Sequence, residues 1–196
     1  MKKALSTLVL LLATLGLQAQ DRRWEHNIHV GSGLLIDNQD GNLQRGFTAK
    51  VGYGIRYRLN GGWSLMPGVA YRTACTNLFN SKEGSDDDAF QYIDVPLTVQ
   101  FHPDRHWVLG LAPVLSFCID HDEWYIDANP NDPLNGRSKI KPFSLGLQPS
   151  ITYQWRRMSL GVEATVGLLN DGNHHGLRPG HKRRLSNVMA LLGVRF

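Results

Sequence analysis

The sequence predicts an all-β fold, an eight-stranded antiparallel up-and-down transmembrane β-barrel, from three observations. Apolar and polar residues alternate with period two in eight segments, each near the length that a tilted strand needs to cross a bilayer. The connections between these segments alternate between long and short. The polar face is charged and rich in glycine, whereas aromatic residues lie near the ends of the apolar face. This distribution favours an apolar exterior facing lipid over an apolar ligand cavity.

The first residues have the pattern of a secretory signal peptide. Lys2 and Lys3 precede an apolar run, and Ala19 is a small residue before the expected cut. We expect residues 1–19 to be removed and residues 20–196 to form the barrel domain. Cleavage lowers the lysine and arginine count from 21 to 19 against 17 acids, so the formal charge falls from +4 to +2. That balance predicts no nucleic-acid partner.

The clearest alternation runs through residues 143–168. Odd positions from Phe143 to Trp155 are apolar, and the even positions between them are polar or glycine. The pattern restarts at Met158, so Arg156 and Arg157 form a tight turn between two strands. We interpret this hairpin as one quarter of the barrel, with Trp155 at the inner membrane interface.

Six further segments complete the count of eight strands. They are residues 24–36, 46–58, 63–73, 90–101, 106–119 and 186–196. The connections after the first, third, fifth and seventh strands are the long ones, at residues 37–45, 74–89, 120–141 and 169–185. Outer-membrane barrels have short periplasmic turns and long external loops. We expect the first and eighth strands to pair, because a closed barrel leaves no backbone edge in lipid.

Four prolines lie inside predicted strands: Pro67, Pro96, Pro113 and Pro149. Proline removes a donor from the strand ladder and prefers edges or bulges. We therefore expect local bulges at these positions.

Charged residues on the polar face predict a structural ion-pair network that fills the lumen. The candidates are Lys50, Arg56, Arg58, Arg72, Asp94, Glu163 and Arg195. Eight strands leave an interior only just wide enough for side chains, and buried charges must be paired. A selectivity lining is the alternative interpretation, but we do not expect a freely conducting general porin.

A basic segment near the C-terminus is a candidate external phosphate-binding loop. Its residues are Arg178, Lys182, Arg183 and Arg184. Arginine binds phosphate bidentately, so this loop suits lipopolysaccharide phosphates, although a solvated loop is the simpler interpretation. The acidic and histidine-containing loops lack metal-ligand spacing, so we predict neither a metal site nor a cofactor.

Two further chemistries receive little support from the sequence. Cys75 and Cys118 fall near the external rim on opposite strand faces, so a disulfide would need irregular structure at Cys75. No serine stands beside a histidine in the rim segments, and His121, with its acidic neighbours, lacks a serine partner. We expect no enzymatic activity and no catalytic residue.

Three short motifs resemble the PorT-like family of outer-membrane β-barrels. They are the Gln-Ala-Gln junction at residues 18–20, the YIDVPL segment at residues 92–97, and the GVRF end at residues 193–196. The resemblance implies an outer-membrane location and implies that Phe196 is part of the signal read by the barrel insertion machinery. Some members of that family are implied to serve protein secretion, and the family carries no catalytic motif.

These observations predict an integral outer-membrane protein with a plugged polar lumen and external loops for envelope interaction. The partners expected are outer-membrane lipid and lipopolysaccharide, the insertion machinery, and envelope or secretion proteins. A narrow transport pore and a lipid A-modifying enzyme are the alternatives.

Overall fold

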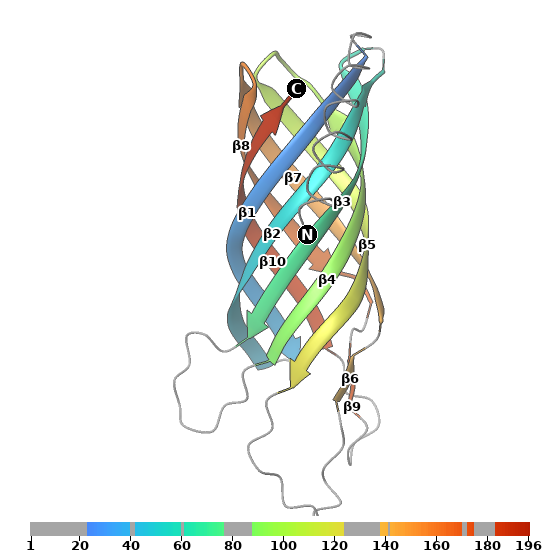
Figure 1. Ribbon diagram of the computed structural model, residues 1–196, viewed down its shortest axis with the longest axis vertical. Coiled ribbons are helices and arrows are strands. Elements are labelled where there is room, and N and C mark those ends of the chain that lie inside the picture. The colour runs from blue at the N-terminus through green and yellow to red at the C-terminus, as the bar shows by residue number, and fades with distance from the viewer. Residues whose placement is uncertain are drawn as a thin grey trace, which may run out of the picture.

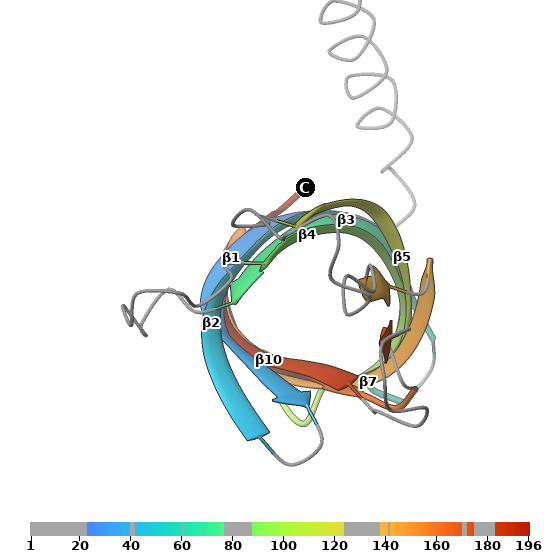
Figure 2. The ribbon, with the colours of Figure 1, turned by 90° about the horizontal axis from the view of Figure 1, so that it is seen from below.

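The computed structural model describes residues 23–39, 42–59, 61–76, 88–123, 138–140, 142–169, 172–174 and 183–196. Eight strands close into an antiparallel barrel in the order β1-β10-β8-β7-β5-β4-β3-β2 (Figures 1 and 2). The predicted fold class is confirmed. The barrel strands are β1 (Trp24–Gln39), β2 (Asn42–Arg58), β3 (Trp63–Thr76), β4 (Asp88–Phe101), β5 (Trp107–Glu123), β7 (Phe143–Trp155), β8 (Met158–Gly167) and β10 (Arg183–Arg195).

The first and last barrel strands form the predicted closing seam. β1 pairs with β10 from Asn27 opposite Arg195 to Gln39 opposite Arg183. Beyond this ladder, His26 and Phe196 exchange two backbone hydrogen bonds of 2.9 and 3.0 Å. The backbone of the barrel therefore has no open edge along this seam.

The two ends of the barrel differ. At the turn end, at the top of Figure 1, short turns join β2 to β3, β4 to β5 and β7 to β8. Gly61 and Gly62 there adopt positive φ of 72° and 81°, and Arg156 does so at 50°. At the opposite loop end, a separate two-stranded sheet of β6 (Ser138–Ile140) and β9 (Gly172–His174) lies beyond the barrel.

Several strands extend past their predicted ends at the loop end. The predicted loop at residues 37–45 is wrong, because β1 and β2 remain paired up to Gln39 opposite Asn42. Similarly, β5 continues to Glu123, and β10 begins at Arg183. Side-chain alternation reports which face is apolar, whereas the backbone ladder continues wherever a neighbouring strand remains available, even where the side chains are polar on both faces.

The prolines do not introduce the predicted bulges. Pairing lapses beside Pro67, Pro96, Pro113 and Pro149 and then resumes in the same register. Within the described strands, the one register shift lies between Gln91 and Tyr92, where β5 contributes an extra residue. A missing proline donor thus costs local ladder bonds without requiring an inserted residue.

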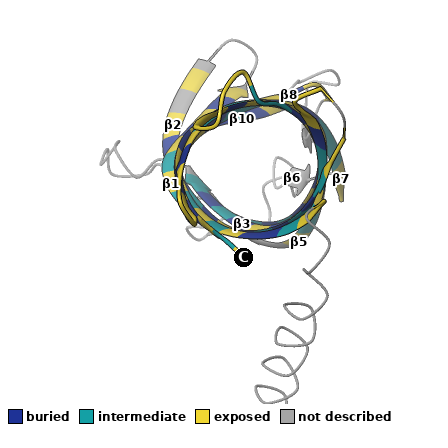
Figure 3. Cartoon of the chain, turned by 90° about the horizontal axis from the view of Figure 1, so that it is seen from above, coloured by how far each residue is buried: buried dark blue, intermediate teal, exposed yellow. Residues whose placement is uncertain are grey.

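The strand faces separate as the alternation predicts. In β5, Leu111 is 49% exposed on the outside, whereas its neighbour Ala112 is fully buried in the interior. Figure 3 shows this banding of buried and exposed positions along the strands. Within the described part of the chain, no helix has the length and apolar character needed to cross a membrane.

Candidate functional site: the barrel lumen

An apolar layer occupies the lumen near the loop end. Leu35, Ala74, Phe90, Tyr92 and Leu185 form one buried cluster, and Leu35 and Phe90 have no exposed surface. The cluster also receives Cys118 from β5, which stands across the barrel from β1. These side chains therefore meet from opposite walls of the barrel.

Next to the apolar layer, on the side of the turn end, the lumen holds a layer of buried ion pairs. Lys50 Nζ on β2 pairs with Glu163 Oε1 on β8, a strand on the far side of the barrel. Gln148 Nε2 donates to the other oxygen of Glu163 at 2.7 Å. Arg72 donates to both oxygens of Asp94, at 2.6 and 3.2 Å. Each charge in this layer consequently has an opposite charge beside it.

Arg72 joins the two layers. Its guanidinium carbon lies 4.3 Å from the centre of the Tyr92 ring, which belongs to the apolar cluster. A cation over an aromatic face is attracted by the ring quadrupole, and here both groups are buried. The apolar layer and the ion pairs therefore pack as one continuous filling.

A small polar cavity of about 60 Å³ follows toward the turn end. Its lining includes Asn27, His29, Arg56 and Gln154, and its size suits a few water molecules. Gly52 provides the room for His29, because a Cβ at residue 52 would lie 2.4 Å from His29 Nε2. Between the ion pairs and the turn end, the lumen is thus lined mainly by polar residues but narrow.

Three arginines share one carboxylate at the turn end. Glu25 accepts from Arg56 Nη1 at 3.0 Å and from Arg58 Nη2, and Arg195 Nη1 lies 3.7 Å away. Arg56 Nε also donates to Gln100 Oε1 at 2.7 Å. With three guanidinium groups on one acid, this cluster leaves an excess of positive charge at the mouth.

The structure brings together a serine and a histidine that the sequence did not pair. Ser64 Oγ lies 2.8 Å from His102 Nε2, because Ser64 is near the start of β3 and His102 directly follows β4. Burial, together with the nearby positive charges of Arg56 and Arg58, lowers the pKa of His102 to about 4. Ser64 is fully buried, so this pair is a structural contact and not an accessible nucleophile.

The predicted charged residues occupy different environments. Lys50, Arg56, Arg72, Asp94 and Glu163 are buried in the lumen. By contrast, Arg58 stands at the rim with its side chain 51% exposed, and that of Arg195 is 15% exposed.

The predicted phosphate-binding loop is only partly described. Arg178 and Lys182 lie outside the described residues, whereas Arg183 and Arg184 belong to β10 and pair with Gln39 and Asn38 of β1. The assignment of these two arginines to a loop is therefore wrong. The strand ladder extends through them because β1 supplies a partner for each.

No disulfide joins Cys75 and Cys118 in this structure. Cys118 packs against the interior cluster, and Cys75 lies opposite Phe47, which is exposed on the outer face. Their opposite faces explain why no disulfide joins them. Among the described residues, no group of three or more histidine, cysteine or acidic side chains is placed to hold a metal ion.

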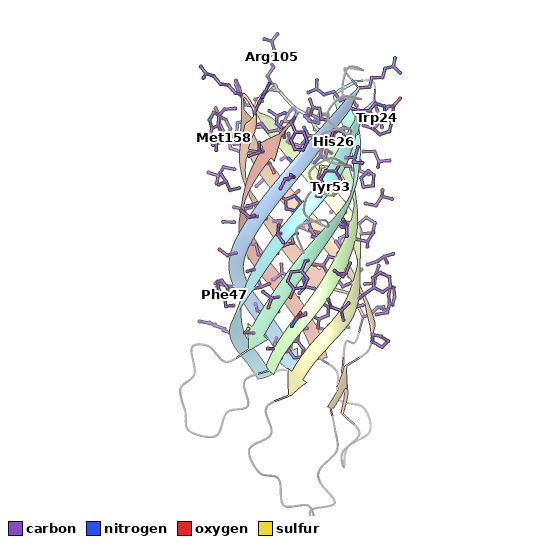
Figure 4. The ribbon with its side chains drawn as sticks, in the orientation of Figure 1. Trp24, His26, Phe47, Tyr53, Arg105 and Met158 are labelled. Carbon is purple, nitrogen blue, oxygen red and sulfur yellow. The ribbon has the colours of Figure 1, made fainter. Side chains whose placement is uncertain are left out.

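Aromatic residues ring the barrel near the turn end. On the outer surface, Trp24 packs on Tyr57, Trp63 packs on Phe101, and Trp107 packs on Tyr153, with ring centres 4.6, 4.9 and 5.1 Å apart. Figure 4 shows Trp24 and Met158 at this level of the barrel and Phe47 near the other end. Such a girdle is typical of residues at a membrane interface.

Comparison with known proteins gives a family and a fold. Residues 18–170 match the family described as outer membrane protein beta-barrel domain. Neisserial surface protein A is 17% identical, with 87% of this chain and 97% of that chain covered and a TM-score of 0.59. The attachment invasion locus protein of Yersinia pestis, solved with the heparin analogue sucrose octasulfate, is 16% identical over 89% and 99% of the two chains, with a TM-score of 0.47. No curated protein matches the chain.

Proposed function

The chain belongs to the outer membrane protein β-barrel family, and we propose that it is a plugged barrel that acts through contacts at its loop end. It is an integral protein of the outer membrane. Short turns of such barrels face the periplasm, so the turn end is periplasmic and the loop end external. The proposed partners at the external end are lipopolysaccharide or another envelope protein, including a component of a secretion assembly as the PorT-like resemblance implies.

The filling of the lumen is the observation that carries this proposal. A hydrated ion moving along the axis meets the apolar layer around Phe90 and then the Lys50–Glu163 pair. Separating a buried ion pair costs about 3–5 kcal/mol, and opening the apolar layer adds to that cost. The filled lumen therefore favours a structural role, in which the interior side chains support the barrel wall, over ion conduction.

The barrel strands are longer than a membrane span requires, and the additional length lies at the external end. The 17 residues of β2 or β5, at about 3.3 Å per residue and a tilt of about 40°, advance roughly 43 Å along the barrel axis, against an apolar belt of about 25 Å. Phe47 pairs with Leu34, and residues 35–39 and 42–46 continue the hairpin beyond them. Leu43 near its tip is 67% exposed. This rigid extension supports a role in presenting surfaces outside the membrane.

Planar-bilayer recording tests the plug. We expect no regular conductance steps from the folded wild-type protein. The double variant Phe90→Ala/Tyr92→Ala should conduct measurably, and Phe117→Ala, an outward-facing aromatic exposed at 42%, should match the wild type. Regular steps from the wild type would instead assign the narrow transport pore, the alternative supported by the polar cavity between the ion pairs and the turn end.

Site-specific photocrosslinking tests the contacts at the external end. A photoreactive residue in place of Leu43 should give discrete adducts with lipopolysaccharide or one envelope protein in intact cells. The same residue in place of Val30, which is 49% exposed in the middle of the lipid-facing belt, is the matched control. Identical adducts from both positions would remove the support for an external binding role.

The lipid A-modifying enzyme receives no support from the Ser64–His102 pair. Lipid A lies in the external leaflet, whereas this pair lies at the periplasmic end with its hydroxyl buried. Mass analysis of lipid A with and without expression of the protein tests this alternative directly.

A further inference from the structure

The periplasmic mouth of the barrel contains a pocket with a strong excess of positive charge. Its volume is about 620 Å³, within the range of small-molecule sites. The cationic or basic side chains that line it are Arg58, Arg105, Arg156, Arg195, His102 and His106. They come from four separate parts of the chain that the barrel brings together: the end of β2, the β4–β5 turn, the β7–β8 turn and the end of β10.

One carboxylate, that of Asp104, lines the pocket, and it is already engaged. Its Oδ1 accepts the backbone N–H groups of His106 and Trp107, at 2.6 and 2.7 Å. These two hydrogen bonds lower the pKa of Asp104, so it remains ionised while capping the turn. Glu25, which is outside the lining, is shared among Arg56, Arg58 and Arg195. The described acids therefore cannot neutralise the four arginines.

The arginines are partly held in place before any ligand arrives. Arg195 Nη2 donates to the carbonyl oxygen of Arg156 at 2.6 Å, and Arg58 is tethered to Glu25. The Nε of Arg195 is buried and has no hydrogen-bond partner. Guanidinium groups fixed in this way pay less conformational entropy when they bind an anion.

The pocket also has an apolar edge at the membrane surface. Leu59 and Trp63 line it, and they are 51% and 47% exposed. Trp63 packs on Phe101 within the aromatic girdle, which lies at the level of lipid headgroups. Figure 4 shows Arg105 projecting at this end of the barrel. Cationic and apolar groups thus stand side by side at the inner leaflet.

We propose that this pocket binds a phosphate group at the periplasmic surface of the membrane, carried by an anionic phospholipid headgroup or by a soluble periplasmic phosphate. Arginine offers two parallel N–H donors to phosphate oxygens, and four arginines in one concavity match a dianion or a phosphodiester with neighbouring oxygens. The site is distinct from the external contacts proposed above, because it lies at the opposite end of the barrel.

Two binding measurements on the full, folded protein separate the two sources. Pyrophosphate titrated by calorimetry into protein in an uncharged detergent probes soluble phosphate. Native mass spectrometry of protein from nanodiscs of equal phosphatidylglycerol and phosphatidylcholine probes the lipid. Pyrophosphate binding without lipid preference assigns a soluble ligand, and retained phosphatidylglycerol assigns the headgroup; either result supports the site.

Charge variants decide whether the pocket is responsible. Arg58→Gln/Arg156→Gln should weaken the bound probe by roughly tenfold or more, because two charge-assisted contacts are lost. Arg157→Gln is the control, because it removes one positive charge from the same turn at a residue outside the pocket lining. This variant should bind the probe as the wild type does. If the double variant fails to show the heat-modifiable gel shift of a folded barrel, Arg105→Gln, at an exposed turn position, serves in its place.

Three results would overturn the proposal. One is wild-type protein that binds neither pyrophosphate nor phosphatidylglycerol above phosphatidylcholine. A second is unchanged binding in the folded arginine variants. The third is an equal loss of binding in Arg157→Gln, which would mean that general surface charge is responsible.

Discussion

The imidazole of His26 stacks on the ring of Phe196, with ring centres 5.6 Å apart and planes inclined by 16°. The same imidazole accepts or donates a 2.6 Å hydrogen bond with the Tyr53 hydroxyl, according to its tautomer. His26 is therefore only 5% exposed although it lies on the lipid-facing side of β1. The terminal aromatic residue is held by the first strand at the point where the barrel closes.

We predict that His26→Ala slows or weakens barrel closure. Loss of the stacked ring and the hydrogen bond should lower the free energy of unfolding by about 1–2 kcal/mol. Phe196→Ala should have a similar effect, and the double variant should lose less than the sum because the two rings contact each other. Refolding into lipid vesicles, followed by the heat-modifiable gel shift, measures the folded fraction.

Val194→Ala is the control for this prediction. Val194 is 46% exposed on β10, two residues before Phe196, and has no ring contact with His26. Equal losses in Val194→Ala and His26→Ala would show that general lipid-facing area, and not the stacked pair, supports the seam.

Removing one partner of the buried Lys50–Glu163 pair should destabilise the barrel much more than removing both partners. Lys50→Met leaves the Glu163 carboxylate buried with Gln148 as its hydrogen-bond donor, and we expect a loss of about 3–5 kcal/mol. The double variant Lys50→Met/Glu163→Leu removes both charges and should recover most of that loss. Urea unfolding followed by tryptophan fluorescence measures the free energies, and simple additivity would contradict coupling across the lumen.

His102, which follows β4, should make the free energy of unfolding fall in mild acid. The pKa of His102 is about 4 in the folded barrel against an ordinary value of 6.5, so the unfolded chain binds the proton first as pH falls. Its contribution to stability is present above pH 6.5 and is lost progressively toward pH 4, amounting to about 1 kcal/mol after solvent screening. His102→Asn should flatten the stability profile across this window, and an unchanged slope would argue against this assignment.

The β7–β8 turn should be stabilised by glycine. Arg156 adopts φ of 50°, a conformation that costs an L-residue roughly 1 kcal/mol, whereas glycine adopts it freely. We expect Arg156→Gly to raise the unfolding free energy by up to about 1 kcal/mol. Arg157→Gly, at a neighbouring residue without positive φ, should not raise it. A gain for both variants would mean that φ is not the cause.

Period-two alternation was sufficient to predict the architecture. Residues 143–155 and 158–168 were predicted as a hairpin with a turn at Arg156 and Arg157, and the structure pairs Trp155 with Met158. The predicted outer-membrane location is confirmed by the family, whereas the narrower PorT-like assignment stays a prediction. Alternation succeeds because each side chain reports directly whether its face meets lipid or the lumen.

The same pattern was a poor guide to strand ends and to the prolines. Residues 37–45 carry mostly polar side chains and were assigned to a loop, yet most of them extend the β1–β2 ladder. The bulge at Gln91 and Tyr92 has no signal in the alternation, and the prolines that suggested bulges have none. Backbone pairing depends on what the neighbouring strand offers, which one segment of sequence does not contain.

By itself, the sequence determined which residues face inward, and thus that charges such as Lys50 and Glu163 lie in the lumen. The tertiary structure alone decided their partners, because neighbours across a barrel come from strands far apart in the chain: Lys50 with Glu163, Ser64 with His102, and His26 with Phe196. It also gathered Arg58, Arg105, Arg156 and Arg195 into one pocket at the turn end. Whether a side chain points inward or outward follows from local alternation along its own strand. Which residues become neighbours depends on barrel closure, strand order and register.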